Sequence, residues 1–175
     1  TNNVKIVSSK INKCEPDFNL EEYKNTDGLI TNKKNLLLST TNADCILLLL
    51  FDPVQKVIAN VHSGWKGTLK RIVANAINQM INSFGCKPEN IICAICPSIR
   101  KCHFEVEKEV KEQFENEFKD LIGSNFTEKN ELKTIKMIDI IEEKVKNEKW
   151  NIDTVLINKI VMQNLGLRPE NILDS

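Results

Sequence analysis

Short apolar runs separated by turn-forming residues dominate the first half of the chain. The run "CILLLLF" at residues 45–51 is continuously apolar, which predicts a strand covered on both faces of a sheet. Asp52 and Pro53 supply a turn, and "KVIANVH" at residues 56–62 predicts the next strand. Shorter apolar runs predict further strands at residues 4–7, 27–31, 35–40 and 90–96.

Helical periodicity follows the strand at residues 56–62. Apolar residues from Leu69 to Phe84 recur at intervals of three and four, which predicts one buried helix face, with Thr68 as N-cap and Gly85 just beyond the end. Residues 119–134 have the composition of a loop or insertion, and we expect no catalytic or binding residues there. Together the patterns predict a sheet with packed helices, of class α/β or α+β. Similar periodicity predicts further helices at residues 105–118, 135–148 and 154–166.

Composition narrows the class of protein. The 175 residues are 41% hydrophobic, which suits a single domain spanning residues 1–175 with its own core. Lys plus Arg and Asp plus Glu both number 24, and no basic block is present, so we expect no nucleic-acid partner. No apolar run reaches the roughly 18 to 20 residues that cross a bilayer, and the first residues do not resemble a signal peptide. These features predict a cytoplasmic protein without membrane contact, and its six cysteines are expected to be reduced.

Cys45 and His62 mark the two ends of the predicted strand pair. If the strands are antiparallel, the start of the first lies beside the end of the second, so the two side chains meet at one edge of the sheet. Thiolate and imidazole are ligands that suit zinc or copper. The same pair could be a thiolate–imidazolium nucleophile, or a core cysteine near a strand-end histidine. Asp44 stands where a carboxylate could orient an imidazole or act as acid or base.

The segment "HSGWKGT" joins the second strand to the predicted helix. Gly64 and Gly67 would let the backbone approach a ligand, and the helix N-terminus with Lys66 favours an anion such as phosphate. Trp65 suits stacking on a planar ring. The alternative interpretation is structural: the two glycines form a tight turn between strand and helix, and Trp65 packs over the core. Their position beside the Cys–His pair favours a binding site.

A third polar patch is "CPSIRKCHFEV" at residues 96–106. Arg100 could hold a phosphate with its guanidinium fork. Cys102 and His103 are potential ligands, but adjacent residues on an extended segment are expected to point to opposite faces. A positively charged loop entering a helix is an alternative interpretation of the same residues.

These motifs together resemble the YfiH-type family, also called the laccase-domain or polyphenol oxidase family. The matching stretches are "NADC" (42–45), "HSGWKG" (62–67), "CPSI" (96–99) and "CHFEV" (102–106), in the family's order and spacing. The resemblance covers essentially the whole chain. It implies an α+β fold, a layered sandwich of mixed β-sheet with flanking helices.

The resemblance also implies a function. Family members are described as zinc-dependent purine nucleoside phosphorylases that act on adenosine, inosine and methylthioadenosine with phosphate, and have adenosine deaminase activity. Cys45 and His62 match two of the zinc ligands, and the third, a histidine in Gln-x-His, is expected just upstream of Thr1. By the same resemblance we expect the catalytic residues to be Asp44, Cys45 and His62, and the substrate contacts to be Gly64, Trp65, Lys66, Gly67, Arg100 and His103.

Three alternatives stay open at this point. The first is a cysteine hydrolase or deamidase with Cys45 as nucleophile and His62 as base. The second is a copper phenol oxidase, although a laccase uses several coppers and more than the two histidines present. The third is a catalytically silent binding domain. The sequence leaves the oligomeric state open between monomer and homodimer.

Overall fold

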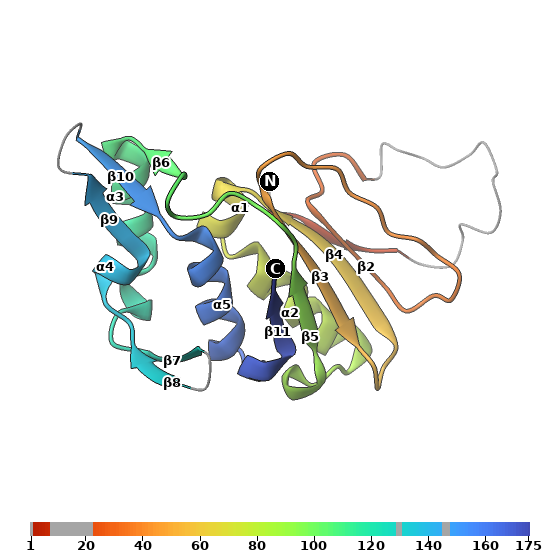
Figure 1. The fold of residues 1–175 in the computed structure, drawn as a ribbon. Helices are drawn as coiled ribbons and strands as arrows, with labels where there is room; N and C mark the ends of the chain where they lie inside the picture. The colour runs from red at the N-terminus through yellow and green to blue at the C-terminus, as the bar shows by residue number, and fades with distance from the viewer. Residues whose placement is uncertain (1, 8–22, 129–130, 145–147) are drawn as a thin grey trace.

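A six-stranded mixed sheet forms the centre of the molecule (Figure 1). The computed structural model describes residues 2–7, 23–128, 131–144 and 148–175. The strand order is β1-β2-β4-β3-β5-β11, in which β1 is parallel to β2, β5 is parallel to β11, and the other neighbours are antiparallel. The strands are β1 (Val4–Ile6), β2 (Gly28–Thr31), β3 (Ile46–Asp52), β4 (Val57–Ser63), β5 (Ile92–Ile95) and β11 (Ile172–Asp174).

Helices cover one face of this sheet. α2 (Ile72–Phe84) packs its apolar side against β4, and α5 (Thr154–Asn164) packs against α2. The short helix α1 (Trp65–Leu69) lies between β4 and α2. The mixed sheet with flanking helices confirms the predicted α+β fold class.

A smaller lobe precedes α5 in the chain. Its three-stranded antiparallel sheet has the order β6-β10-β9, and a separate hairpin pairs β7 with β8. The lobe lies beside α5, on the side away from the large sheet (Figure 1). Its elements are β6 (Glu105–Val106), α3 (Lys108–Glu117), β7 (Asn125–Glu128), β8 (Glu131–Thr134), α4 (Met137–Ile140), β9 (Ile141–Lys144) and β10 (Lys149–Ile152). Single 3₁₀ turns occupy Pro88–Asn90, Lys119–Leu121 and Pro169–Asn171.

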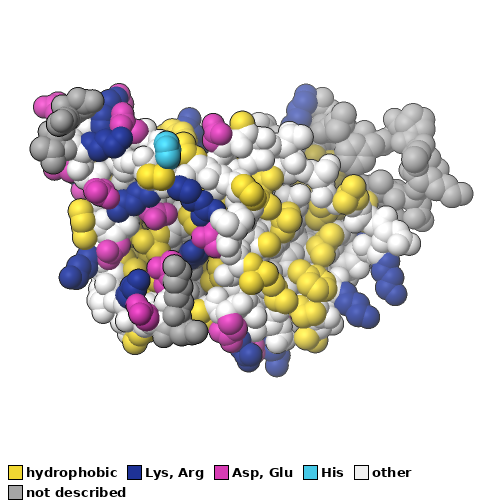
Figure 2. Space-filling view, in the orientation of Figure 1, with side chains coloured by type: hydrophobic (Ala, Val, Ile, Leu, Met, Phe, Trp, Pro, Cys, Tyr) yellow, Lys and Arg dark blue, Asp and Glu magenta, His cyan; other side chains and the backbone are white. Residues whose placement is uncertain are grey.

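The opposite face of the large sheet is apolar and partly open. In β3, Leu48 is fully buried, whereas Leu49 and Phe51 are each 42% exposed. The prediction that this strand is covered on both faces is therefore wrong, because the helices of the described residues pack on the other face of the sheet. Hydrophobic side chains gather over β3, β4 and β5 in Figure 2. Within the described residues, no helix is both long and apolar enough to span a membrane.

The predicted strand at residues 35–40 is also wrong. These residues form a turn and an irregular segment. Asn35 has a left-handed backbone (φ 64°), and Leu37 is 86% exposed. The segment is held to the sheet by a side chain, because the amide of Asn60 donates a hydrogen bond to the carbonyl of Leu38.

The predicted long helix after β4 is interrupted. Arg71 has a left-handed backbone (φ 54°), which ends α1 and lets α2 begin at Ile72. Thr68 is therefore not an N-cap but a buried residue inside α1. Gly85 follows α2 with φ 68°, as predicted for a residue that ends a helix.

Three predictions in the second half are corrected by strand pairing. Residues 119–134 contain the hairpin of β7 and β8. The helix predicted at 135–148 is one turn, α4, followed by β9, and 145–147 lie outside the described residues. The helix predicted from Glu105 begins at Lys108, because residues 105–106 pair with β10. The predicted helix at 154–166 is confirmed as α5.

Candidate functional site

Strand pairing brings Cys45 and His62 to the same end of the sheet. In the antiparallel pair of β3 and β4, Leu47 lies opposite His62 and Ile46 lies opposite Ser63. Cys45 directly precedes β3 and Gly64 directly follows β4, so these two residues face each other at the end of the ladder. The prediction that the two strands are antiparallel neighbours is confirmed.

Gly64 provides the space between the two side chains. A Cβ atom at this position would lie 3.3 Å from Sγ of Cys45 and 3.5 Å and 3.7 Å from Cε1 and Nε2 of His62. The backbone of Gly64 (φ −65°, ψ 173°) is one that any residue can adopt. A side chain at this position would therefore crowd the Cys45 thiol without straining the backbone, and the space in front of Gly64 is bordered by Cys45 Sγ and His62 Nε2.

Asp27 contacts the other nitrogen of the His62 ring. Oδ1 of Asp27 lies 3.4 Å from Nδ1, and the carbonyl of Asp27 accepts a 2.7 Å hydrogen bond from the His62 backbone N–H. A carboxylate at Nδ1 favours the tautomer whose Nε2 lone pair is free to bind a metal or accept a proton. The sequence patterns predict a strand at residues 27–31 and assign Asp27 no role in the site. The register of β2 and β4, with Gly28 opposite Val61, is the signal that places it beside His62.

A buried polar cluster links the end of β4 to α1 and α5. The hydroxyls of Ser63 and Thr68 lie 2.9 Å apart, and the amide of Asn158 donates to Thr68 Oγ1 at 3.3 Å. All three residues are at most 1% exposed. This cluster ties α1 and α5 to the strand that carries His62.

The segment after β5 lies beside the start of β3. The backbone N–H of Cys96 donates to the carbonyl of Leu47 (3.0 Å), and that of Ile99 donates to the carbonyl of Asp44 (2.9 Å). The Asp44 side chain is exposed, and it is Asp27 rather than Asp44 that contacts the His62 ring. The motifs "NADC" and "CPSI" thus come together, although they are far apart in the sequence.

The turn after β4 differs in part from expectation. Because α2 begins at Ile72, the helix N-terminus at the turn is that of the five-residue α1, at Trp65, and not that of the long helix as predicted. Gly67 is buried, and a Cβ there would approach Ile72 Cγ2 (3.4 Å). Lys66 is exposed, with Nζ 5.2 Å from the centre of the half-buried Trp65 ring.

The patch at residues 96–106 forms a turn. Arg100 pairs with Asp174 (2.8 Å) and donates to the carbonyl of Ser175 (2.8 Å). Cys102 Sγ lies 3.0 Å from Nδ1 of His103, and both residues are exposed. The expectation that these neighbours point to opposite faces is wrong, because the backbone turns at residues 101–103 instead of staying extended.

Two of the remaining described thiols lie in the core. Cys86 and Cys93 are 3% and 0% exposed, and burial raises the pKa of each to about 12. For Cys86, a hydrogen bond to Asp52 contributes to this raised pKa after burial. Neither residue is a source of thiolate near neutral pH. The five described cysteines are unbridged, and Cys14 lies outside the described residues.

The donor set can be compared with what a metal requires. Cys45 and His62 are donors of the kinds that zinc prefers, and the Asp27 contact at Nδ1 is the usual arrangement around a metal-binding histidine. Across the described part of the chain, no three His, Cys, Asp or Glu side chains cluster as a metal site. The described residues therefore fit two positions of a zinc site and do not supply a third protein ligand.

Comparison with known proteins matches the chain to one protein family and to named relatives. A family model described as multi-copper polyphenol oxidoreductase laccase matches residues 1–175. The purine nucleoside phosphorylase YlmD of Bacillus subtilis is 29% identical over 149 residues, which are 85% of this chain and 48% of that protein. The mouse purine nucleoside phosphorylase LACC1 is 39% identical over 89 residues, 51% of this chain and 21% of that protein. This chain therefore spans about half or less of the length of these relatives.

Solved structures share the fold. A Bacillus licheniformis hypothetical protein, YfiH, superimposes with a TM-score of 0.69 and 25% identity, covering 86% of this chain and 50% of that one. YlmD of Geobacillus stearothermophilus gives a TM-score of 0.67 at 20% identity, covering 85% of this chain and 49% of that one.

Proposed function

This chain belongs to the multi-copper polyphenol oxidoreductase laccase family, and on that premise we propose that it takes part in purine nucleoside phosphorolysis. Relatives named purine nucleoside phosphorylase support the proposal. In this reaction a phosphate oxygen bonds to C1′ of the ribose while the C1′–N9 bond breaks. The bond's electron pair leaves with the purine, which takes up a proton, and ribose 1-phosphate is released.

The observation that carries the proposal is the convergence of Cys45 Sγ and His62 Nε2 on the space in front of Gly64. We propose that Cys45 as thiolate and His62 through Nε2 hold a zinc ion, with Asp27 keeping the proton on Nδ1. Bound zinc supplies Lewis-acid chemistry and lowers the pKa of a bound water. That chemistry would also serve the adenosine deaminase activity implied by the family resemblance.

The neighbouring residues suit the substrates. Lys66 is an exposed cation at the turn after β4, and the half-buried Trp65 presents an aromatic surface beside it. Asp44, exposed beside Cys45, is our candidate acid for the leaving purine. Arg100 is our candidate phosphate contact. It directly follows Ile99, whose backbone N–H donates a hydrogen bond to the carbonyl of Asp44.

The decisive experiment measures zinc content and phosphorolysis of inosine, adenosine and methylthioadenosine together. Cys45→Ala and His62→Ala should each lose bound zinc and at least about a hundredfold of the turnover. Cys93→Ala, which removes a buried thiol from the helix-covered face of the sheet, should keep both. Wild-type turnover in Cys45→Ala would overturn the proposal.

One observation favours a second candidate, a cysteine hydrolase or deamidase. Cys45, His62 and Asp27 follow the nucleophile–base–carboxylate order of a catalytic triad. Under this alternative, iodoacetamide alkylates Cys45 rapidly, zinc gives no protection, and a thioester on Cys45 can be trapped with an acyl substrate. Protection by stoichiometric zinc without a trapped acyl group excludes it.

A further inference from the structure

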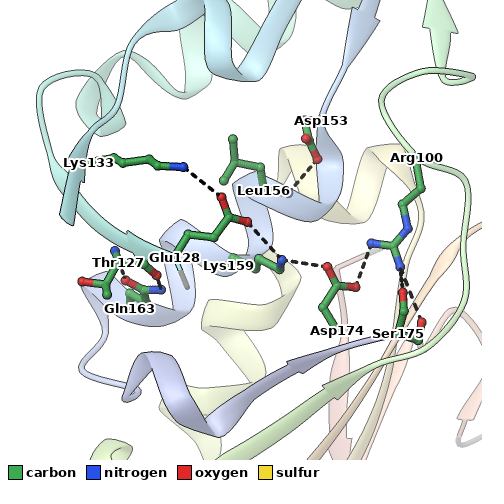
Figure 3. A network of polar contacts seen from close by, with 10 residues as sticks. All are labelled: Arg100, Thr127, Glu128, Lys133, Asp153, Leu156, Lys159, Gln163, Asp174 and Ser175. Atoms are coloured by element: carbon green, nitrogen blue, oxygen red, sulfur yellow. Dashed lines mark hydrogen bonds and ion pairs between the residues drawn. The ribbon is translucent and has the colours of Figure 1, made fainter. Parts of the chain in front are cut away.

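Polar side chains link the smaller lobe to the rest of the molecule. On one side, Glu128 of β7 lies 3.7 Å from Lys159 of α5, and Lys159 pairs with Asp174 of β11 (Figure 3). On another side, Arg71 pairs with two carboxylates of the lobe. Because Arg71 lies between α1 and α2, four residues after Gly67, this second link reaches the chain just after the residues of the candidate site.

The backbone of Arg71 is in the left-handed region, with φ 54° and ψ 46°. This conformation is unfavourable for a residue with a side chain, and it persists only where the surrounding structure holds it. At Arg71 it interrupts the helical path after α1 and sets the direction in which α2 continues. The side chain of Arg71 supplies contacts that hold the backbone in this state.

All three nitrogens of the Arg71 guanidinium donate to the smaller lobe. Nε donates to Oε1 of Glu117 (2.9 Å), Nη1 donates to Oδ2 of Asp120 (2.8 Å), and Nη2 donates to Oδ1 of Asp120 and to the carbonyl of Glu117. The guanidinium carbon lies 5.0 Å from the ring centre of Phe118, which is fully buried. The hydrogen bond with Asp120 raises the pKa of Arg71 and lowers the pKa of Asp120, so both groups are charged at neutral pH.

These contacts form a stronger link than an ordinary surface ion pair. A single exposed pair contributes little, because solvent screens it and both side chains lose conformational freedom. The pair with Asp120 is bidentate, and the guanidinium also packs on an aromatic ring. We call the contacts of Arg71 with Glu117, Phe118 and Asp120 the Arg71 clamp. Glu117 ends α3 and Asp120 lies in the next 3₁₀ turn, so the clamp joins the lobe to the break between α1 and α2.

The clamp also holds the end of α1. The backbone N–H of Arg71 donates to the carbonyl of Thr68 (2.9 Å), and that of Lys70 donates to the carbonyl of Lys66 (3.1 Å). A helix of five residues is too short to be stable by itself, so its orientation depends on how it is held. The hydroxyl of Ser63 holds Thr68 near β4, and the clamp holds the residue that follows α1 and its C-cap.

We propose that Arg71 is a positioning residue: through the smaller lobe it holds α1 so that Lys66 meets the phosphate substrate. The role of Lys66 rests on the proposed function, whereas the clamp and its hold on α1 do not. Loss of the clamp should weaken phosphate binding and leave zinc binding unchanged, because strand pairing holds Cys45 and His62. A residue that only stabilised the fold would not affect phosphate and nucleoside differently.

The test compares the KM for phosphate with the KM for inosine in Arg71→Gly and Asp120→Asn. Glycine accepts the left-handed backbone, so Arg71→Gly removes the clamp without adding strain. Asp120→Asn weakens the bidentate pair and leaves residue 71 unchanged. Each variant should raise the KM for phosphate at least about fivefold, and zinc content and the KM for inosine should stay within about twofold of wild type. Arg168→Gly, which removes an exposed arginine before the turn at Pro169–Asn171, is the matched control and should behave as wild type.

Two further measurements separate positioning from other effects. In a Lys66→Ala background, Arg71→Gly should change the KM for phosphate by less than about twofold, because the group that it positions is gone. In a Trp150→Phe background, Trp65 is the remaining tryptophan of the two in the chain. Arg71→Gly and Asp120→Asn should then each increase acrylamide quenching of Trp65 fluorescence at least about 1.5-fold, because α1 is held less firmly.

An unchanged KM for phosphate in both folded variants overturns the inference, even though phosphorolysis by the wild-type protein would leave the proposed function standing. Effects of Lys66→Ala and Arg71→Gly that multiply fully also overturn it, because Arg71 then does not act through Lys66. If the wild-type protein turns over no nucleoside, the proposed function fails and the quenching of Trp65 is the test. Increased quenching in both variants then supports the hold of the clamp on α1, and unchanged quenching overturns it.

Discussion

The ring of His62 lies with Nδ1 3.4 Å from Oδ1 of Asp27, across the pairing of β2 with β4. Both side chains are partly exposed, at 30% and 24%. The contact orients the imidazole so that Nε2 is directed to the space shared with Cys45. Asp27 therefore acts through His62 as a positioning residue.

Replacing Asp27 tests this relationship. Asp27→Asn should lower zinc affinity about tenfold to a hundredfold, because the histidine loses the carboxylate that orients it. The measurement is competition with a chromophoric chelator at pH 7. Glu89→Gln, an exposed carboxylate in the turn before β5, is the matched control and should have wild-type affinity. An Asp27→Asn protein with unchanged affinity would show that the contact does not position the ring.

Two glycines separate an effect on the site from an effect on stability. Gly64→Ala places a Cβ 3.3 Å from Cys45 Sγ at an ordinary φ, so it should impair zinc binding at least about tenfold with little loss of stability. Gly85→Ala has open space but a positive φ (68°), so it should cost about 1 kcal/mol of unfolding free energy and leave zinc binding intact. Chelator competition and urea unfolding of both variants check the contrast. The interpretation of Gly64 as a spacer is untenable if its variant binds zinc normally.

That Cys45 and His62 lie at the same end of the strand pair was predictable, because the turn at Asp52 and Pro53 is short and apolar strands flank it. Asp27 was not, since it lies 35 residues from His62 and only the register of a third strand brings them together. Local patterns reveal neighbours in a hairpin, whereas a partner from a distant strand depends on the tertiary arrangement.

Tertiary pairing also explains the failure at residues 135–148. The apolar residues there fit a helical period, yet residues 141–144 pair with β10, and Ile140 and Ile141 are buried by that arrangement. Hydrophobic periodicity reports which side chains are buried. It does not report which backbone partner is available, so a short apolar segment remains ambiguous between helix and strand.

Adjacent leucines in β3 test the one-sided burial of the large sheet. Leu48→Ala should cost about 3 kcal/mol, because Leu48 is fully buried against the helix layer. Leu49→Ala, the same substitution on the opposite face, should cost about 1 kcal/mol or less because that side chain is 42% exposed. Chemical unfolding of the two variants gives the comparison. Equal losses would mean that the open face is covered in solution.

Thiol reactivity follows burial. In a Cys14→Ser background, the exposed Cys102 should react rapidly with Ellman's reagent, whereas Cys86 and Cys93 should react only after unfolding. With pKa values of about 12, roughly one in ten thousand of these two thiols is ionised at pH 8. Mass spectrometry of the partially modified protein identifies the residues. Early modification of Cys93 in folded protein would contradict its burial.

The ion pairs of Asp174 predict a specific acid dependence. Burial tends to raise the pKa of this carboxyl, but hydrogen bonds from Lys159 and Arg100 outweigh it and lower the pKa below its usual value. Because the folded pKa lies below the unfolded pKa of about 3.9, the stabilisation is fully present above roughly pH 4 to 5 and is lost as the pH falls through the folded pKa. Asp174→Asn should therefore cost about 1 kcal/mol at pH 7 and progressively less below pH 4. Urea unfolding at pH 7, 4 and 3 measures this loss, with the exposed Glu131→Gln as control. A cost that stays constant down to pH 3 would show that the charge of Asp174 does not stabilise the fold.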